Sequence, residues 1–567
     1  MTNAVRVTRA ALLIAAVCGV SGGALAEEVP LEVDPAVLEA QSARAEVVDR
    51  IAPTVVAIFG PAGGGGGSGV LITADGYAVT NFHVTNGCGD AMKCGLNDGR
   101  VYDAVIVGTD PVGDVALIKL LGRDDFPFAT FGDSDTVRPG EWCLAMGNPF
   151  LLAKSDFAPT VTYGLVSGTH RYQEPAGTFL EYTDCLQIDA SVNPGNSGGP
   201  LFRADGPGAG ELIGINGRIS IKRGRVNSGA AYAISSNQVK YFLGHLRSGR
   251  ALDHGTLNAT VRTTYEGNVL FDRVLEGSYA EVRGVREGDE LVAFAGRPIR
   301  SVNQFKNVLG VYPAGWALPL TVRRGGETLD VLVRTRGLNR STDIEKTVAP
   351  KPGPPPNDVV KPLLKKRPGF ANAYFNRVER ERVLESLDID APDAAWRITG
   401  ADADGQSAEF TVGDSGVGLK LGENRFLQPL TEDAEIADDP PGSGGLLFGL
   451  SQLRLLMTGR TDDFADFYYV GTEPLDWDGP TVDVVAATQR GFTTHFYVQQ
   501  EENGGGTLRG FDTWRSVRGQ AAEVRFSGEP VSGPIPIPSR MTVSSGGTEY
   551  RDFEFTNATA APTEDDE

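Results

Sequence analysis

The feature that most limits the fold is a series of short apolar runs between residues 54 and 236, separated by Gly, Asp and Asn. Runs of this length at this spacing predict many short strands in a sandwich or barrel, and they do not fit parallel βαβ units. A helix is expected at about 237–248 (NQVKYFLGHLRS), where it closes the region. Representative runs are TVVAIF at 54–59, GVLIT at 69–73, YAVT at 77–80, DAVIVG at 103–108 and DVALIKL at 114–120.

The first 26 residues have the features of an export signal. Arg6 and Arg9 precede a short apolar core at 10–17, and Ala-Leu-Ala at 24–26 fits a cleavage site. The core is too short for a transmembrane helix, so we expect a secreted or periplasmic protein; an uncleaved membrane anchor is the alternative. The formal net charge of −21 argues against a nucleic-acid partner, because phosphate binding needs clustered Lys and Arg.

The chain of 567 residues is long enough for roughly three or four domains. PKPGPPP at 350–356 is too rich in proline to pack and marks a linker. The predicted division is a signal peptide at 1–26, a first domain at 27–250, a second at 255–338, a proline-rich linker at 339–369, an α+β domain at 370–558 and an acidic tail at 559–567.

The string NPGNSGGP at 193–200 is the strongest candidate for chemistry. A serine hydroxyl becomes a good nucleophile only when a base takes its proton and donors face the developing oxyanion. The glycines around Ser197 allow a tight turn in which the amides of Gly195 and Ser197 point at one oxygen. A merely flexible loop is the alternative interpretation of this string.

Two upstream segments supply the partners that such a serine needs. His83 ends a predicted strand-turn-strand segment, where an exposed imidazole is expected. Asp114 opens an apolar strand, and a buried carboxylate there needs hydrogen-bond donors such as the Nδ1–H of an imidazole. The order His, Asp, Ser is that of the chymotrypsin class.

These segments resemble the HtrA/Deg proteases over about residues 45–248. The resemblance implies a chymotrypsin-like double β-barrel in which His83 is the general base, Asp114 orients it and Ser197 is the nucleophile. It also implies an oxyanion hole made by the backbone amides of Gly195, Asn196 and Ser197. The matching motifs are GSGVLITADGYAVTNFHV at 67–84, DPVGDVALIKL at 110–120, FGDSDTVRPGEWCLAMGNP at 131–149, LQIDASVNPGNSGGPL at 186–201 and AYAIS at 231–235.

The same resemblance implies an endopeptidase that acts on unfolded or misfolded exported proteins and assembles as a trimer, with no metal ion or organic cofactor. The alternative is a peptide-binding chaperone or scaffold of the cell envelope with little proteolysis. Ser191 stands six residues before the nucleophile, where a trypsin-like pocket carries Asp, so a basic side chain would find no partner there. Ile215 and Ile219 are candidates for an apolar pocket wall, and core positions are the alternative.

Four cysteines follow the predicted signal peptide, and an exported protein can oxidise them. Cys88 and Cys94 enclose five residues and are predicted to form a disulfide. Cys143 and Cys185 are the remaining pair, for which a disulfide and buried thiols are both open.

The second domain resembles a PDZ domain of the same family, through GVREGDEL at 284–291 and GRPI at 296–299. Such domains capture peptide C-termini by strand addition. The usual Gly-apolar-Gly-apolar carboxylate loop is missing, and LNATV at 257–261 stands in its place, so a spacer or regulatory role is the alternative.

Residues 370–558 carry an amphipathic helix at 370–387, an apolar helix near 446–457 and alternating strands such as FTTHFYV at 492–498. The pattern resembles the curved antiparallel sheets of LolA-like lipoprotein carriers. It implies an apolar concave face for a lipid or an envelope-protein partner.

Overall fold

The structure, a computed structural model, describes residues 33–60, 66–149, 156–174, 180–222, 226–348, 355–387, 389, 391–515 and 521–561. Within these ranges, only the backbone is described for residues 218–222, 226–228, 515 and 561. The predicted signal peptide therefore lies outside the described residues. The chain divides into a short unit at 1–46 and a compact unit at 47–567. Helix α2 (Pro35–Ile51) runs across this division and leads into the 3-10 helix η1 (Ala52–Thr54). Among the described residues, the helices are all too short or too polar to serve as membrane spans.

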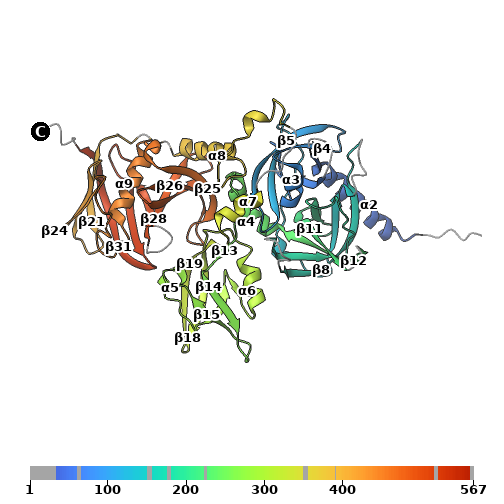
Figure 1. The fold of residues 1–567 in the computed structure, drawn as a ribbon, viewed down its shortest axis with the longest axis horizontal. Coiled ribbons are helices and arrows are strands. Elements are labelled where there is room, and N and C mark those ends of the chain that lie inside the picture. Colours follow the sequence, from blue (N-terminus) through green and yellow to red (C-terminus); the bar gives the residue numbers. More distant parts are fainter. Residues whose placement is uncertain are drawn as a thin grey trace, which may run out of the picture. The chain divides into compact units, whose positions relative to one another are not determined.

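The first half of the compact unit begins with a closed six-stranded barrel in the order β1-β2-β3-β6-β5-β4 (Figure 1). Alternate apolar side chains point inward, and Val56, Ile58 and Leu71 are fully buried in its core. A short helix, α3 (Phe82–Cys88), connects β3 to β4. The strands are β1 (Val55–Phe59), β2 (Gly66–Leu71), β3 (Tyr77–Thr80), β4 (Ala91–Gly95), β5 (Val101–Asp110) and β6 (Val115–Leu120).

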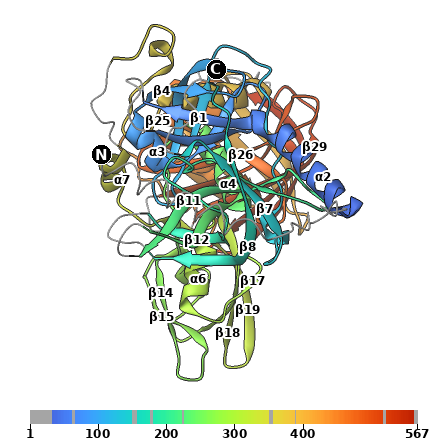
Figure 2. The same ribbon diagram turned by 90° about the vertical axis from the view of Figure 1, so that its right-hand side faces the viewer.

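A second closed barrel follows, in the order β10-β11-β12-β9-β8-β7 (Figure 2). The 3-10 helix η2 (Ser134–Thr136) precedes it, and α4 (Ser236–Arg247) follows it at the place where a closing helix is predicted. The predicted double barrel is thus confirmed. Its strands are β7 (Trp142–Gly147), β8 (Thr160–Gln173), β9 (Tyr182–Ile188), β10 (Pro200–Arg203), β11 (Leu212–Lys222) and β12 (Val226–Ser235).

The next region is an antiparallel sheet in the order β14-β15-β16-β18-β19, with β17 beside β16 and a separate pair β13-β20. Helix α6 (Val302–Leu309) places Phe305 and Val308 in the core of this sheet. The other elements are β13 (Gly255–Thr256), β14 (Ala259–Thr263), β15 (Val269–Val274), α5 (Tyr279–Val282), β16 (Glu290–Phe294), β17 (Arg297–Pro298), β18 (Ala317–Arg324), β19 (Glu327–Arg334) and β20 (Arg336–Gly337).

The segment predicted as a linker contains ordered structure in its described part. Helix α7 (Ser341–Val348) and the 3-10 helix η4 (Lys361–Leu363) lie within it. Val360 is buried in the same core cluster as barrel residues, and Asn357 Nδ2 donates to Asp103 Oδ1 at 3.0 Å. The chain after residue 355 is therefore attached to the first barrel.

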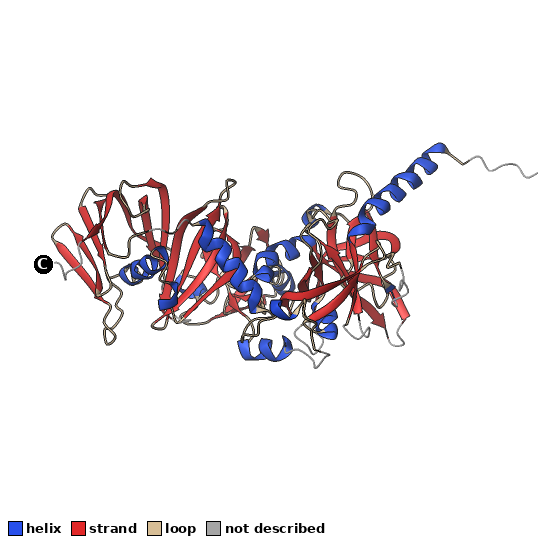
Figure 3. Cartoon of the chain, turned by 90° about the horizontal axis from the view of Figure 1, so that it is seen from above, coloured by secondary structure: helices blue, strands red, loops and turns tan. Residues whose placement is uncertain are grey.

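The C-terminal region is an eleven-stranded antiparallel sheet in the order β24-β23-β22-β21-β31-β30-β29-β28-β27-β26-β25. Helix α8 (Ala373–Ser386) precedes it, and every residue of α9 (Leu446–Met457) is buried against it. Strands dominate the described residues, as predicted (Figure 3). The elements are β21 (Ala395–Asp402), β22 (Ser407–Val412), β23 (Gly416–Leu421), β24 (Asn424–Pro429), η5 (Thr461–Asp463), β25 (Asp466–Pro474), β26 (Thr481–Gln489), β27 (Phe492–Gln500), β28 (Gly506–Arg515), β29 (Ala522–Pro530), β30 (Pro538–Ser545) and β31 (Thr548–Ala561).

Candidate active site

His83 is the second residue of helix α3, directly after strand β3 ends. The start of this helix is tied to Asp114: the backbone carbonyl of Asp114 accepts from Asn81 Nδ2 at 3.0 Å and from the Phe82 amide at 3.2 Å. The amide of His83 itself donates to Asp114 Oδ1 at 3.0 Å. The imidazole is 42 % exposed, so it lies at the surface of the barrel while its support is buried.

Asp114 is fully buried and holds the imidazole through Nδ1, which is 2.8 Å from Oδ2 and 3.1 Å from Oδ1. The hydroxyl of Tyr182, at the start of β9, donates to the same Oδ2. A buried carboxylate is stable only with such donors. Because the carboxylate of Asp114 accepts the hydrogen of His83 Nδ1, the neutral imidazole keeps its lone pair on Nε2. This is the nitrogen that has to act as the base.

The electrostatics of His83 follow from this contact. Partial burial disfavours the charged imidazole, but the hydrogen bond and the negative charge of Asp114 outweigh it and raise the pKa of His83 above its ordinary value. The imidazole is thus a stronger base than a free histidine.

Ser197 lies in the predicted glycine turn, which packs against the strand ends beside His83. Gly195 and Gly198 have φ values of +106° and +83°, which a side chain rarely adopts. A Cβ on Gly198 would lie 2.2 Å from Thr80 Oγ1 and 2.9 Å from the Asn81 amide nitrogen. The turn thus touches the two residues that precede Phe82 and His83, although within the described part of the chain Ser197 Oγ forms no hydrogen bond with His83.

The backbone amides of the turn divide into two groups. Asn196 N donates to Asn193 O at 2.9 Å, so this amide is used inside the turn. The predicted contribution of Asn196 to an oxyanion hole is therefore wrong, because the donor is already engaged. Among the described residues, the amides of Gly195 and Ser197 donate to no partner. These two remain the candidate oxyanion donors.

Ser68 on β2 holds the turn and was not predicted from the sequence. Its amide donates to Ser197 O at 2.8 Å, and its hydroxyl donates to Gly195 O at 2.7 Å and accepts from Asn148 N at 2.9 Å. In the sequence, the available signal is a polar serine within the glycine-rich segment that leads into an apolar strand; its full burial is seen in the structure. Tyr182 was also missed, since it opens a strand with no motif around it.

The candidate pocket residues separate in the structure. Ser191 is exposed, and its carbonyl accepts from Thr162 Oγ1 at 3.0 Å. Ile215 is fully buried in the core cluster that joins the barrels, so the prediction that it walls an open pocket is wrong. The backbone of Ile219 pairs with Ala231, and its side chain lies outside the described residues.

The predicted Cys88–Cys94 disulfide is not formed. Both are free, buried thiols in the core of the first barrel, and burial raises the pKa of Cys88 to about 11. Cys143 is also a free thiol, whose pKa burial raises to about 12. Cys143 therefore forms no disulfide with Cys185. The Sγ atom of Cys185 lies 3.5 Å from the carbonyl oxygen of Thr183.

A second polar cluster joins Asp135, His170 and Asp184, whose ligand atoms lie within 4.8 Å of one another. Arg297 fills this cluster, with Nη1 2.8 Å from Asp184 Oδ1 and Nη2 2.9 Å from Asp135 Oδ1. The guanidinium therefore supplies the positive charge that these carboxylates need.

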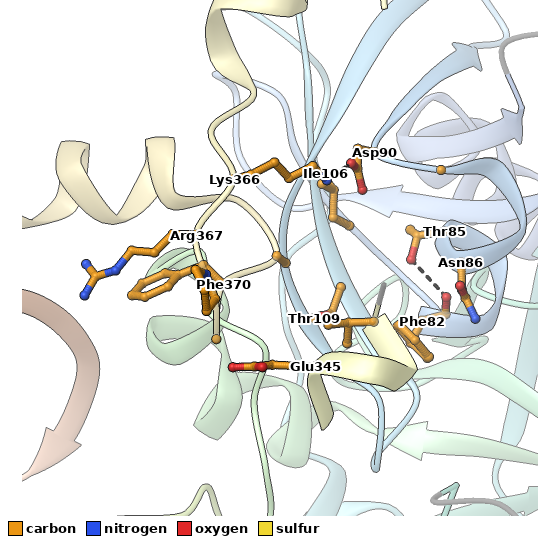
Figure 4. A pocket seen from close by; sticks show the side chains of 15 residues that line it. Phe82, Thr85, Asn86, Asp90, Ile106, Thr109, Glu345, Lys366, Arg367 and Phe370 are labelled. Atoms are coloured by element: carbon orange, nitrogen blue, oxygen red, sulfur yellow. Dashed lines mark hydrogen bonds and ion pairs between the residues drawn. The ribbon is translucent and has the colours of Figure 1, made fainter. Parts of the chain in front are cut away.

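A pocket of about 360 Å³ lies beside helix α3 (Figure 4). Phe82 and Thr85 line it from α3, Thr109 from β5, Glu345 from α7 and Phe370 from the segment before α8. The lining includes none of His83, Asp114 and Ser197, so this pocket is separate from the candidate active site.

Comparison with known proteins identifies the family. The model of the trypsin-like peptidase domain matches residues 67–215. A probable periplasmic serine endoprotease DegP-like from Marinomonas sp. is 36 % identical over 283 residues, which are 48 % of this chain and 57 % of that protein. A putative serine protease HhoA from Synechocystis sp. is 34 % identical over 298 residues, which are 49 % of this chain and 72 % of that protein.

A solved structure, HtrA-type protease AlgW with tripeptide, is 29 % identical, with a TM-score of 0.42, and the match covers 55 % of this chain and 98 % of that one. This chain spans a little over half the length of the DegP-like relatives that it matches. Because the match to the HhoA protein covers 72 % of that protein at 34 % identity, the chain belongs to the HtrA/Deg family of trypsin-like serine proteases.

Proposed function

We propose that this chain is a serine endopeptidase that hydrolyses peptide bonds of unfolded or misfolded proteins outside the cytoplasm. The observation that carries the proposal is the contact between His83 Nδ1 and the fully buried Asp114 Oδ2 at 2.8 Å. The glycine turn of Ser197 packs against the residues that lead to His83. Names of relatives that include the word periplasmic, and the export signal expected at 1–26, support the location.

In the proposed mechanism, Nε2 of His83 takes the hydroxyl proton of Ser197 as Oγ attacks the peptide carbonyl carbon. The amides of Gly195 and Ser197 donate to the oxyanion that forms on the carbonyl oxygen. His83 then gives its proton to the leaving amine as the C–N bond breaks, which leaves an acyl-enzyme. A water activated by the same imidazole hydrolyses the ester and restores Ser197. No metal ion or organic cofactor takes part.

Substrate selection follows from Ser191 at the position of the trypsin-like aspartate. With no carboxylate there, a Lys or Arg side chain would lose its hydration without a counter-charge. We therefore propose cleavage after small or medium aliphatic residues.

Residues 255–338 are proposed to act as a PDZ-like peptide-binding domain. In the described part of the chain, β14 pairs only with β15, so one edge is open to an added strand. The family resemblance further suggests a homotrimer. A lipid or envelope-protein partner of residues 370–558 would have to displace α9, because this helix already covers the apolar face.

A peptide-binding chaperone with little proteolysis is the second candidate function. It is favoured by one observation, the missing hydrogen bond between Ser197 Oγ and His83 in the described structure. Catalytic contacts of this kind often tighten only when substrate binds.

Digestion of casein by the wild type and by Ser197→Ala tests the proposal. Loss of the nucleophile should lower the rate on the order of 10⁴- to 10⁶-fold. Equal cleavage by both proteins would overturn the catalytic assignment. A wild type that binds denatured casein but never cuts it, even with added C-terminal peptides, would support the chaperone instead.

A further inference from the structure

A second buried histidine–aspartate pair lies directly beneath the turn that carries Asp114. His254 Nε2 is 2.8 Å from Asp110 Oδ2, and the two side chains are 2 % and 0 % exposed. The ring of Phe242 packs on the imidazole, with ring centres 4.7 Å apart. A pair so enclosed is costly unless each group meets its partner, so its geometry is well defined.

Asp110 shapes the turn itself. Its other carboxylate oxygen, Oδ1, accepts from the amide of Val112 at 3.0 Å and from that of Gly113 at 2.9 Å. A Cβ on Gly113 would lie 2.4 Å from Asp110 Oδ2 and 2.9 Å from His254 Nε2. A side chain at this position would collide with both the carboxylate and the imidazole, so the backbone of the turn passes close to the pair.

The next residue of the turn is Asp114, in a conformation that needs such support. Its φ is +60°, in the left-handed region that residues other than glycine seldom adopt. This conformation lets the Asp114 carbonyl accept from Asn81 and Phe82 while its carboxylate faces His83. If the turn changed to a more common backbone conformation, the carbonyl and the carboxylate of Asp114 would both move.

His254 is fixed from the other side by the chain that follows the barrels. Its carbonyl accepts from the amide of Leu338 at 3.0 Å, and its backbone forms a bridge with Pro313. Just before it, the amide of Leu252 donates to Thr109 O at 2.8 Å. His254 thus connects residues 313 and 338 of the middle region, through its backbone, to the turn of Asp114, through its imidazole.

The protonation of His254 agrees with a donor role. Burial disfavours the charged imidazole, but the charge of Asp110 and its hydrogen bond outweigh burial and raise the pKa of His254. The 2.8 Å contact with a carboxylate oxygen, which can only accept when ionised, assigns Nε2 as the donor. Nδ1 is buried and, within the described residues, has no hydrogen-bond partner.

We propose that His254 is a positioning residue of the peptidase: by holding Asp110, it sets the turn that presents Asp114 to His83. The inference rests on the proposed function. It gives the region after the barrels a direct mechanical connection to the catalytic carboxylate.

The test compares three variants of the full chain. His254→Phe removes the donor but keeps a ring of similar size, and His254→Gln keeps an amide donor near the position of Nε2. His245→Phe is the matched control, because His245 is also buried but its Nδ1 is 2.9 Å from Val470 O and its Nε2 is 2.9 Å from Trp316 Nε1, away from the turn. The readouts are kcat and KM on casein, the rate at which a fluorophosphonate labels Ser197, and the thermal midpoint.

We expect His254→Phe to lower kcat and the labelling rate at least about tenfold, with KM nearly unchanged, because a small displacement of a catalytic group lowers the reaction rate strongly. His254→Gln should recover most of the loss, and His245→Phe should lower the thermal midpoint without lowering the labelling rate. A folded His254→Phe with the wild-type labelling rate overturns the inference, as does an equal loss of rate in His245→Phe.

If His254→Phe does not fold, the double variant His254→Phe/Asp110→Asn replaces it, since removing both partners leaves no buried unpaired charge. The same tenfold loss is expected there, and an unchanged rate overturns the inference. Ser197→Ala is assayed in parallel: if it cleaves as fast as the wild type, the proposed function has failed and this inference with it. If only Ser197→Ala is inactive while His254→Phe is normal, this inference alone has failed.

Discussion

Tyr182 donates its hydroxyl hydrogen to Oδ2 of Asp114, the same oxygen that lies 2.8 Å from His83 Nδ1. Asp114 thus receives donors from two barrels, because His83 follows β3 of the first and Tyr182 opens β9 of the second. The orientation of the carboxylate depends on how the two barrels pack together.

Replacing Tyr182 by phenylalanine removes one donor from this buried carboxylate and keeps the ring. A hydrogen bond to a charged group contributes about 1.5–3 kcal/mol, so we expect roughly this loss in the free energy of unfolding. We also expect a lower kcat with little change in KM, since Asp114 is free to turn away from His83. Urea unfolding and casein kinetics measure the two effects, and a variant with wild-type stability and kcat would show that the contact is unimportant.

The sequence predicted the groups that local motifs mark and missed those that only the fold brings together. His83, Asp114 and Ser197 stand in short strings whose glycines and polar residues are hard to explain otherwise. Tyr182 is 68 residues from Asp114 in sequence, and Ser68 is 127 residues from Gly195, so no spacing rule connects them. Such contacts follow from barrel closure, which local patterns do not report.

Helix α3 shows a different limit. Its sequence, FHVTNGC, contains Thr, Asn and Gly, which disfavour helix, and the sequence predicts no helix there; the strand-turn-strand segment expected to end at His83 corresponds to β2 and β3. The helix forms because Asp114 accepts from the backbone amides of Phe82 and His83 and from the side chain of Asn81, which satisfies the donors at its start. Tertiary hydrogen bonds therefore override local preference at the site.

The activity should rise with pH through a pKa above that of a free histidine. The general base must be neutral, and Asp114 raises the pKa of His83 above about 6.5. Asp114→Asn removes the negative charge and replaces one acceptor oxygen by an NH2 donor, so the acid limb of kcat/KM should move to lower pH while the plateau falls on the order of 10⁴-fold. The rate of fluorophosphonate labelling from pH 5 to 9 measures both changes. An acid limb that stays in place in Asp114→Asn would contradict the assignment of His83 as the titrating base.

Ser68→Ala should loosen the nucleophile turn. The substitution removes the hydroxyl that donates to Gly195 O and accepts from Asn148 N, and the loss of a hydrogen-bond partner for a buried group costs about 1–3 kcal/mol. Because Gly195 also supplies a proposed oxyanion donor, kcat should fall while casein still binds. Ser68→Thr keeps the hydroxyl but adds a methyl group next to the turn, and Ser301→Ala, which removes the side-chain cap of α6, is the control for loss of a structural serine. Equal kcat in Ser68→Ala and Ser301→Ala would show that Ser68 does not position the turn.

The cluster of Asp184, His170 and Arg297 predicts a pH window for stability. Burial favours the neutral acid, but His170 and Arg297 outweigh it and lower the pKa of Asp184. This contribution is complete above the unfolded pKa of about 3.9 and is lost as the pH falls through the folded pKa. Asp184 in turn raises the pKa of His170 through a hydrogen bond at 2.7 Å. That contribution is complete below the unfolded pKa of about 6.5 and is lost as the pH rises through the folded pKa.

Both contributions are therefore present together between about pH 4 and 6.5. The difference in thermal midpoint between the wild type and Asp184→Asn should be largest in this window and should shrink above it, as His170 loses its proton. Asp272→Asn is the matched control, since Asp272 pairs with Arg262 at 3.1 Å on the surface and no histidine takes part. Its difference from the wild type should be small and constant from pH 5 to 9. A constant difference for Asp184→Asn as well would mean that His170 does not titrate against this carboxylate.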